Sequence, residues 1–307
     1  MILALDIGGT ELKLGWVDDE GQIRERGRAS VAFDGYRTGI LTTVIRETSR
    51  FLQRQTEAPV GVAVSACGQI EMHSGVVIGS NGTIPDYEGL NLKEILGKLV
   101  GKPVVVLNDG NAAVLGEWFC GRGQGCSDLL MITLGTGIGG GIITGGRLLT
   151  GRRGIAGEIG RIPFSCGGQD YMQEKHRCWE EYASTRALVR RCEEAIGERG
   201  LDGQQIFDRV CSGDHQLLEI VQEWIDCIAE GVTGLVHLLN PEMVLIGGGV
   251  SVQENAVIAP LRMRIQEKCM PRFAEALIVE RAVLGNDAGM LGAVCYFLQQ
   301  QAAEKVR

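Results

Sequence analysis

The chain has 307 residues, of which 45% are hydrophobic and 22% charged, a composition typical of a folded protein that buries a full core. Its formal net charge of −8 excludes nonspecific binding to nucleic acid, which requires a basic surface. The sequence contains no run of about 20 apolar residues, which is the length needed to cross a membrane. The amino terminus lacks the pattern of a signal peptide. We therefore expect a cytoplasmic protein.

The first third of the chain predicts three strands, followed by helices that alternate with strands. The expected elements are strands over 2–6, 11–17 and 23–30, a helix over 39–55, strands over 60–65 and 76–78, a helix over 92–100 and a strand over 103–107. This order is typical of a mixed α/β domain.

The rest of the chain repeats this order of elements. The expected elements are a helix over 109–119, strands over 129–134, 138–144 and 147–149, helices over 178–196 and 216–239, a strand over 243–246, a helix over 256–268, a strand over 276–279 and a helix over 289–300. The sequence therefore predicts an internal duplication, although the two halves share little sequence identity.

Two glycine-rich turns, each directly after an apolar strand, are the most informative local feature. One spans residues 6–10 (DIGGT) and the other spans 134–141 (LGTGIGGG). Glycine permits positive φ angles and lets backbone N–H groups approach an anion closely. Either turn alone could be only a tight hairpin. Two in one chain indicate two lobes that hold a single polyphosphate.

A possible catalytic carboxylate lies between these turns. Asn108 and Asp109 directly follow the expected strand over 103–107. A carboxylate there could accept a proton from an attacking hydroxyl. Asp109 could also serve as the cap of the following helix, and the two roles are compatible.

Seven motifs, in order along nearly the whole chain, resemble those of the ROK family of bacterial sugar kinases and repressors, in the actin-like ATPase superfamily. They are LALDIGGTELKLG at 3–15, VVVLNDGNAAVLGE at 104–117, ITLGTGIGGGIITGGRLLTG at 132–151, GIAGEIG at 154–160, CWEEYAS at 178–184, NPEMVLIGGGVS at 240–251 and GNDAGMLGA at 285–293. The chain is most similar to the branch without zinc, which includes N-acetylmannosamine kinases and β-glucoside kinases.

The resemblance implies an actin-like ATPase fold, which is ribonuclease H-like and α/β, with two lobes and a cleft between them. We expect residues 1–107 to form a small amino-terminal lobe, on which the carboxy-terminal helix 286–307 packs back. Residues 108–285 are expected to form a larger α/β lobe.

The resemblance also implies ATP and Mg²⁺. Asp6 would orient Mg²⁺ through water, because this ion retains several of its waters in proteins. The turn over 247–249 would line the adenosine pocket, unless it is only a turn between strand and helix. The expected nucleotide-binding residues are Asp6, Gly8, Gly9, Thr10, Lys13, Gly135, Thr136, Gly137, Gly248, Gly249 and Asn286.

The same resemblance assigns the residues that act on the sugar. Asp109 would be the base that accepts the hydroxyl proton, and Asn108 would bond a neighbouring hydroxyl. Glu158 and Glu180 would accept hydrogen bonds from sugar hydroxyls, although Glu181 could take the place of Glu180.

The chain departs from the family at its zinc site. Many relatives have a histidine three residues after the glutamate of GEIG, followed by C-x-C-G-x-x-G-C. Arg161 stands at the histidine position, and of the cysteines only Cys178 aligns, with Cys166 and His176 at other spacings. A tetrahedral zinc site needs about four ligands, and arginine cannot supply one. We therefore expect no zinc. Arg161 would either donate to the sugar or be an outward-facing charge.

The loop over 80–89 resembles the sugar-contacting N-x-P-x-W-x-G motif of the family only in part. Either Asn81 or Thr83 would contact the sugar, and Tyr87 stands where tryptophan is expected. This loop would decide which sugar is bound.

We therefore predict an ATP-dependent kinase for the 6-hydroxyl of a hexose or N-acetylhexosamine. The first candidate is N-acetylmannosamine, and the alternatives are glucose and β-glucosides. The chain retains Asp6 and Asp109, which argues against a sugar sensor that has lost catalytic activity. A repressor of this family would need a helix-turn-helix before the first glycine turn, and only five residues precede Asp6. No nucleic-acid or membrane partner is expected, and a homodimer is possible.

Overall fold

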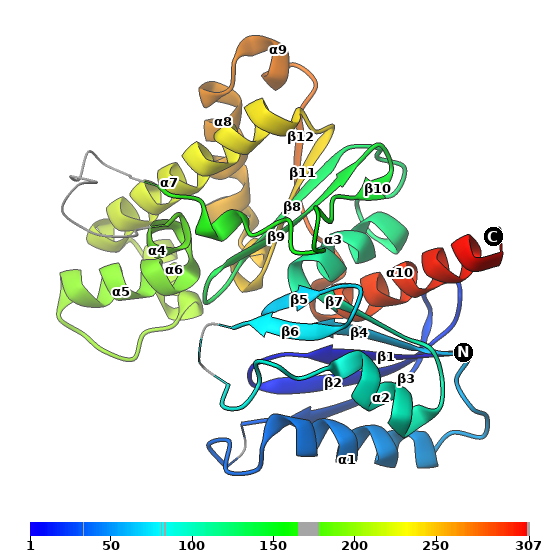
Figure 1. The fold of residues 1–307 in the computed structure, drawn as a ribbon. Coiled ribbons are helices and arrows are strands. Elements are labelled where there is room, and N and C mark those ends of the chain that lie inside the picture. Colours follow the sequence, from blue (N-terminus) through cyan, green and yellow to red (C-terminus); the bar gives the residue numbers. More distant parts are fainter. Residues whose placement is uncertain (33, 81, 83, 165–177, 306–307) are drawn as a thin grey trace. The chain divides into compact units, whose positions relative to one another are not determined.

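The structure is a computed structural model that describes residues 1–305 except 33, 81, 83 and 165–177 (Figure 1). The chain forms two compact units. Unit 1 comprises Met1–Gly125, Leu148–Gly157 and Asn286–Arg307, and unit 2 comprises Cys126–Arg147 and Glu158–Gly285. None of the helices in the described part of the chain is long and apolar enough for a membrane span.

Unit 1 contains a five-stranded mixed sheet in the order β3-β2-β1-β4-β7. β2 pairs antiparallel with both β1 and β3, whereas β1, β4 and β7 are parallel. β4 is entirely buried, as expected for a strand covered on both faces. The strands are β1 (Ile2–Ile7), β2 (Glu11–Val17), β3 (Ile23–Ser30), β4 (Val62–Ala66) and β7 (Val104–Asn108).

Helices cover both faces of this sheet, with α1 and α2 on one face and α3 and α10 on the other (Figure 1). A two-stranded sheet made of β5 and β6 follows β4 in the chain. The bounds are α1 (Ile40–Gln53), β5 (Gln69–Glu71), β6 (Val76–Gly79), α2 (Leu92–Val100), α3 (Asp109–Cys120) and α10 (Ala288–Lys305).

The close packing of α3 on α10 explains why unit 1 extends beyond the expected boundary at residue 107. A Cβ atom on Gly116 would collide with the carbonyl of Ala288, and one on Gly292 would collide with that of Ala112. Glycine at both positions lets the two helix backbones approach closely. Residues 108–125 therefore belong with the amino-terminal sheet, which corrects the expected division.

Unit 2 contains a second five-stranded sheet in the order β10-β9-β8-β11-β12. β8 is antiparallel to β9 and parallel to β11, and β11 is parallel to β12. This arrangement matches that of unit 1 and confirms the predicted duplication. The strands are β8 (Leu129–Leu134), β9 (Ile138–Thr144), β10 (Arg147–Leu148), β11 (Met243–Gly247) and β12 (Ile278–Arg281).

The helices of unit 2 differ from the predicted ones in three places, one of which is the short helix α9 (Pro271–Ala274), which the sequence analysis did not predict. The single helix expected over 178–196 is broken at Ser184, whose hydroxyl accepts from the amide of Ala187 and caps α5. The sequence analysis also missed α6, which begins with a capping box of Asp202 and Gln205. The helices are α4 (Glu180–Ala183), α5 (Thr185–Ile196), α6 (Gly203–Cys211), α7 (His215–Leu239), α8 (Ala259–Lys268) and α9 (Pro271–Ala274).

Candidate active site

The carboxylate of Asp6 is held by its neighbours on both adjacent strands. Asp6 is paired in register with Lys13 on β2 and with Ser65 on β4. Lys13 Nζ lies 3.0 Å from Oδ2, and Ser65 Oγ donates to Oδ1 over 2.7 Å. Both oxygens of this half-buried carboxylate are therefore fixed in direction. Sequence reasoning missed Ser65, although a hydroxyl in an otherwise apolar buried strand is a recognisable signal.

The turn after β1 presents backbone amides. The amide of Gly8 donates to the carbonyl of Glu11 and closes the turn. The carbonyl of Thr10 accepts from the amide of Val31, and the carbonyl of Gly9 accepts from the hydroxyl of Tyr36. No acceptor is recorded within the described residues for the amides of Gly9 and Thr10. These two N–H groups are thus available for an anion.

Tyr36 was not predicted as part of the site. Its backbone lies in the left-handed region, at φ 62°, directly after Gly35 at φ 68°. A tyrosine in this region is uncommon, and such positions gather at functional sites. No pattern in the sequence predicts this conformation.

Asp109 lies at the junction of β7 and α3, where its side chain is exposed. Its Oδ1 accepts from Asn108 Nδ2 and from the amide of Gly110, each over 2.9 Å. The helix cap is Asn108, whose Oδ1 accepts from the amides of Gly110 and Asn111. This leaves Asp109 oriented and accessible, as a general base must be.

Asn108 also fixes the turn after β4. Its Nδ2 donates to the carbonyl of Gly68 over 2.8 Å. The carbonyl of the preceding residue, Cys67, accepts from the hydroxyl of Tyr87 over 3.1 Å. Burial, and then the negative charge of Asp109, raises the pKa of the Cys67 thiol to about 11. The thiol is therefore neutral and unreactive at physiological pH.

Unit 2 carries the second glycine turn, between β8 and β9. The amide of Gly135 donates to the carbonyl of Gly137, and the carbonyl of Gly135 accepts from the amide of Thr185 at the start of α5. Among the residues that the structure describes, no acceptor is recorded for the amides of Thr136 and Gly137. Within the described part of the chain, each glycine turn therefore has two amides at its tip that donate to no protein acceptor.

Glu180 lies directly against this turn. A Cβ atom on Gly137 would collide with Glu180 Oε2, so any larger residue there would displace this carboxylate. The same oxygen accepts from the amide of Ile138 over 3.3 Å, and Oε1 lies 3.1 Å from Arg161 Nη1. The structure thus brings Glu180 and Arg161 together in an ion pair, with most of Arg161 exposed.

Glu158 belongs to the same charged group. It has a solvent-exposed surface, but the atoms crowded around its carboxyl desolvate it and raise its pKa. The positive charge of Arg161 opposes this shift, and the negative charge of Glu180 adds to it. Unit 2 therefore holds two carboxylates and one guanidinium in electrostatic contact.

The residues expected at the adenosine are placed in different units. Gly248, at φ 90°, lies so close to Leu134 that a Cβ atom would collide with its carbonyl, and Gly249 begins the helical turn after β11. Asn286 belongs to unit 1, where its carbonyl lies 3.4 Å from Lys13 Nζ. The backbone of Asn286 is therefore grouped with Asp6 and Lys13.

Two predictions concern residues outside the described part of the chain. They are the sugar contact of Asn81 or Thr83, and the spacing of Cys166 and His176 in the segment 165–177. The described residues contain no group of three or more metal-ligating side chains. The expected absence of zinc stays a prediction.

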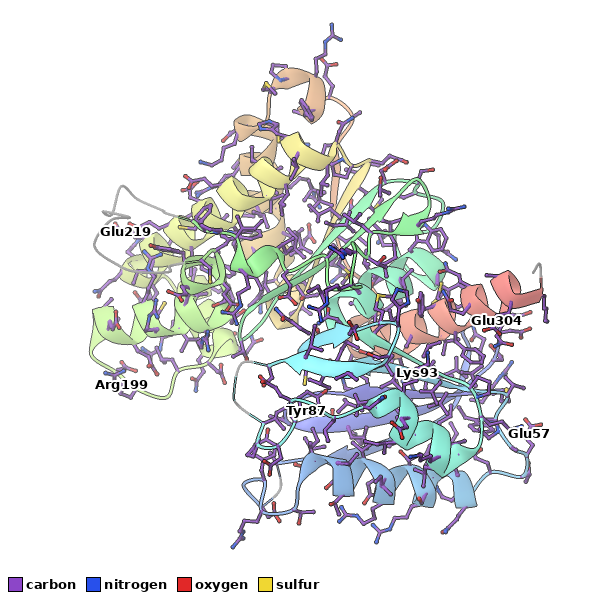
Figure 2. The ribbon with its side chains drawn as sticks, viewed as in Figure 1. Glu57, Tyr87, Lys93, Arg199, Glu219 and Glu304 are labelled. Carbon is purple, nitrogen blue, oxygen red and sulfur yellow. The ribbon has the colours of Figure 1, made fainter. Side chains whose placement is uncertain are left out.

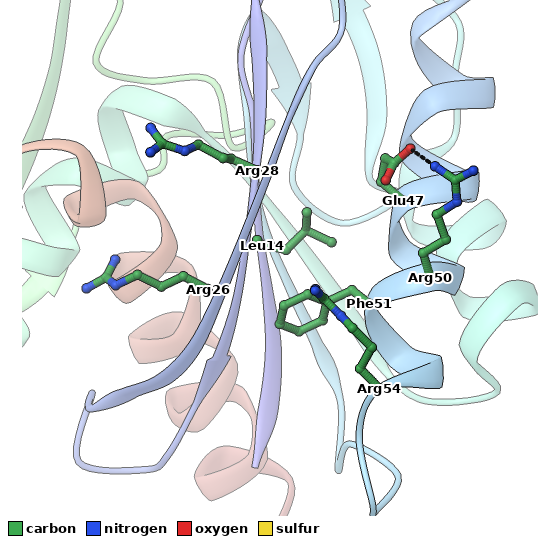
Figure 3. A pocket seen from close by; sticks show the side chains of 8 residues that line it. Leu14, Arg26, Arg28, Glu47, Arg50, Phe51 and Arg54 are labelled. Carbon is green, nitrogen blue, oxygen red and sulfur yellow. Dashed lines mark hydrogen bonds and ion pairs between the residues drawn. The ribbon is translucent and has the colours of Figure 1, made fainter.

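A pocket of about 490 Å³ in unit 1 contains none of the predicted site residues (Figure 3). Arg26 and Arg28 point away from Phe51, while Arg50 is paired with Glu47 (Figure 3). Arg26 is also paired with Asp287. The pocket is therefore not a convergent anion site, despite its arginines. It is lined by Leu14, Arg26, Gly27, Arg28, Glu47, Arg50, Phe51 and Arg54.

Comparison with known proteins gives a consistent result over the whole chain. The model of the ROK family matches residues 2–300. A β-glucoside kinase of Listeria monocytogenes is 34% identical over 304 residues, which cover 98% of each chain. These matches extend over both units.

Two solved structures are similar in fold and in sequence. A candidate N-acetylmannosamine kinase from Listeria monocytogenes has a TM-score of 0.84 at 33% identity, and covers 98% of this chain and 99% of its own. A ROK family glucokinase from Streptomyces griseus, in complex with glucose and AMPPNP, has a TM-score of 0.78 at 32% identity, and covers 95% and 97%. The duplicated α/β architecture is thus the actin-like ATPase fold.

Proposed function

The chain belongs to the ROK family and is an ATP-dependent sugar kinase, and we propose that it phosphorylates the 6-hydroxyl of a hexose. The observation that carries this proposal is the placement of Asp109 in unit 1. Its carboxylate is exposed, is oriented by Asn108, and belongs to the same unit as the glycine turn that follows Asp6.

The free amides of the two glycine turns would bind the phosphates of ATP. Phosphoryl transfer depends mainly on positioning and on charge stabilisation, which fixed N–H groups provide. Lys13 would add a positive charge beside the first turn. Gly248, Gly249 and Asn286 would contact the rest of the nucleotide.

Asp109 would act as the general base. It would accept the proton of the 6-hydroxyl as the hydroxyl oxygen attacks the γ-phosphorus, and ADP would leave with the electron pair of the broken bond. Asn108 uses both of its amide hydrogens within the protein, so its main role would be to orient this carboxylate. If Asn108 also contacts a sugar hydroxyl, it would do so through its side-chain carbonyl oxygen, or its Nδ2 would have to give up one of its two present acceptors.

Asp6 has the chemistry needed to hold Mg²⁺ through water. A single, well-directed carboxylate fits an ion that prefers a few direct protein ligands and retains its waters. Bound Mg²⁺ would neutralise charge on the phosphates. The Ser65 and Lys13 contacts would keep the carboxylate in one orientation for that purpose.

Glu158 and Glu180 would bind the sugar hydroxyls. As ionised carboxylates they only accept hydrogen bonds, which suits a polyol. An N-acetyl carbonyl would instead need a donor, and Arg161, which is paired with Glu180 through Nη1 and is mostly exposed, would have further N–H groups to supply one. These contacts therefore do not discriminate between glucose, a β-glucoside and the N-acetylmannosamine that the sequence motifs favour.

An ADP-release assay over glucose, cellobiose and N-acetylmannosamine would test the proposal. We expect turnover with at least one sugar, and a loss of at least about a hundredfold in kcat for Asp109→Asn, which keeps the shape of the side chain and removes the base. Absence of turnover with every sugar, or full activity of Asp109→Asn, would show the proposal to be wrong.

A further inference from the structure

Tyr87 is a buried polar residue for which the mechanism above has no role. It lies in unit 1 on the loop between β6 and α2 (Figure 2) and is 1% exposed. The preceding Asp86 is in the left-handed region at φ 54°, and Gly89 follows at φ 84°. These turns direct the tyrosine into the core, away from the solvent.

The hydroxyl of Tyr87 reaches the turn that leads to the catalytic base. It donates to the carbonyl of Cys67 over 3.1 Å. The next carbonyl, that of Gly68, accepts from Asn108 Nδ2, and the same nitrogen also donates to Asp109 Oδ1. An unbroken series of contacts therefore joins Tyr87 to the carboxylate of Asp109.

The turn at Gly68 has little freedom to move by itself. Its φ angle is 89°, and a Cβ atom there would lie 2.7 Å from the carbonyl oxygen of Gly79 at the end of β6. Two consecutive carbonyls of this turn are thus held by two side chains. The direction in which the Gly68 carbonyl meets Asn108 would therefore depend on the contact that Tyr87 makes with the adjacent carbonyl.

We propose that Tyr87 is a positioning residue for Asp109, acting through the Cys67-Gly68 turn and the amide of Asn108. This inference rests on the proposed role of Asp109 as the base. The physical reason is that a small displacement of a catalytic group costs a large factor in rate. The packing of the aromatic ring alone does not supply this function.

Tyr87→Phe tests the proposal, because phenylalanine keeps the ring and removes only the hydroxyl. We expect kcat with the best sugar to fall by about tenfold to a hundredfold, while the KM for ATP stays within about twofold of the wild type, since the phosphate turns are untouched. AMPPNP-binding stoichiometry gives the fraction of folded protein, so that kcat is expressed per competent molecule.

Tyr296→Phe on α10 is the control, because Tyr296 is half-buried and its hydroxyl has no hydrogen-bond partner among the described residues. It should leave kcat unchanged. If Tyr87→Phe does not fold, Tyr87→Leu removes the hydroxyl without adding volume to this fully buried position. The same fall in kcat is expected.

The outcomes separate the two proposals. A wild-type enzyme that needs Asp109, together with a Tyr87→Phe variant of unchanged kcat per competent molecule, would overturn only the role of Tyr87. Equal loss in Tyr87→Phe and Tyr296→Phe would also overturn it, because removal of any tyrosine hydroxyl would then matter. An Asp109→Asn variant with full activity would instead remove the proposed function itself.

Discussion

The hydroxyl of Ser65 donates to Oδ1 of Asp6 across two parallel strands, over 2.7 Å, and is completely buried. The other oxygen of Asp6 is held by Lys13 from the antiparallel neighbour. The first residue of the phosphate-turn motif is therefore fixed from both sides of its strand. Little space remains between the Asp6 carboxylate and Gly289 in the first turn of α10.

Gly289→Ala should disable the enzyme although it places a better helix former in α10. The new Cβ atom would lie 2.8 Å from Ser65 Oγ and 3.0 Å from Asp6 Oδ1. We expect the carboxylate to shift and kcat/KM for ATP to fall by about tenfold to a hundredfold. Steady-state kinetics at varied ATP concentration measures this.

Gly234→Ala on α7 is the control for that substitution. Among the described residues, no atom outside its own helix lies within 4 Å of the new Cβ position. It should stabilise the fold by about 1 kcal/mol, as alanine does in an open helix position, and leave the kinetics unchanged. If Gly289→Ala also leaves kcat/KM for ATP unchanged, the function of Asp6 does not depend on the space that Gly289 leaves beside its carboxylate.

Tyr36→Phe should weaken nucleotide binding more than catalysis. The hydroxyl of Tyr36 donates to the carbonyl of Gly9 in the phosphate turn. Loss of one such bond, at about 1 kcal/mol, corresponds to a rise of about fivefold in the KM for ATP, while the KM for sugar should not change. An increase confined to the sugar KM would contradict this assignment.

Arg161→Gln should change the pH dependence of sugar binding. Arg161 lowers the pKa of Glu158, which desolvation and the charge of Glu180 raise above its ordinary value. Since sugar binding would need the ionised carboxylate, kcat/KM for sugar should fall as the pH decreases through this pKa. Removal of the positive charge should raise the pKa further and move the acid limb to higher pH.

A pH–rate profile of kcat/KM for sugar measures that shift. Arg152→Gln is a suitable control, because Arg152 is an exposed arginine nearby in the sequence with no ion-pair partner recorded among the described residues. Its acid limb should coincide with that of the wild type. An acid limb of Arg161→Gln that stays in place or moves to lower pH would exclude electrostatic coupling to Glu158.

Much of the fold could be predicted from local patterns. The alternation of β3, the apolar run of β4 and the glycine turns are properties of a few consecutive residues, and the structure has strands and turns at these positions. The glycines of the two turns do not have positive φ angles, so the conformational freedom of glycine is not what these turns use. The repeated order of elements predicted two similar sheets, which the strand orders confirm. The break at Ser184 was missed because a serine cap competes with a helical pattern that continues on both sides.

The sequence by itself therefore determined the duplicated fold, because the order of elements depends on short-range backbone preferences and side-chain type. Its family motifs supplied the residues that we propose for phosphate, proton and sugar chemistry. Only the tertiary structure decided their partners. Ser65 meets Asp6 through strand register, Gly137 meets Glu180 through helix packing, and Tyr87 turns inward toward Cys67. Such contacts join residues far apart in the chain, so only the folded packing of the elements specifies them.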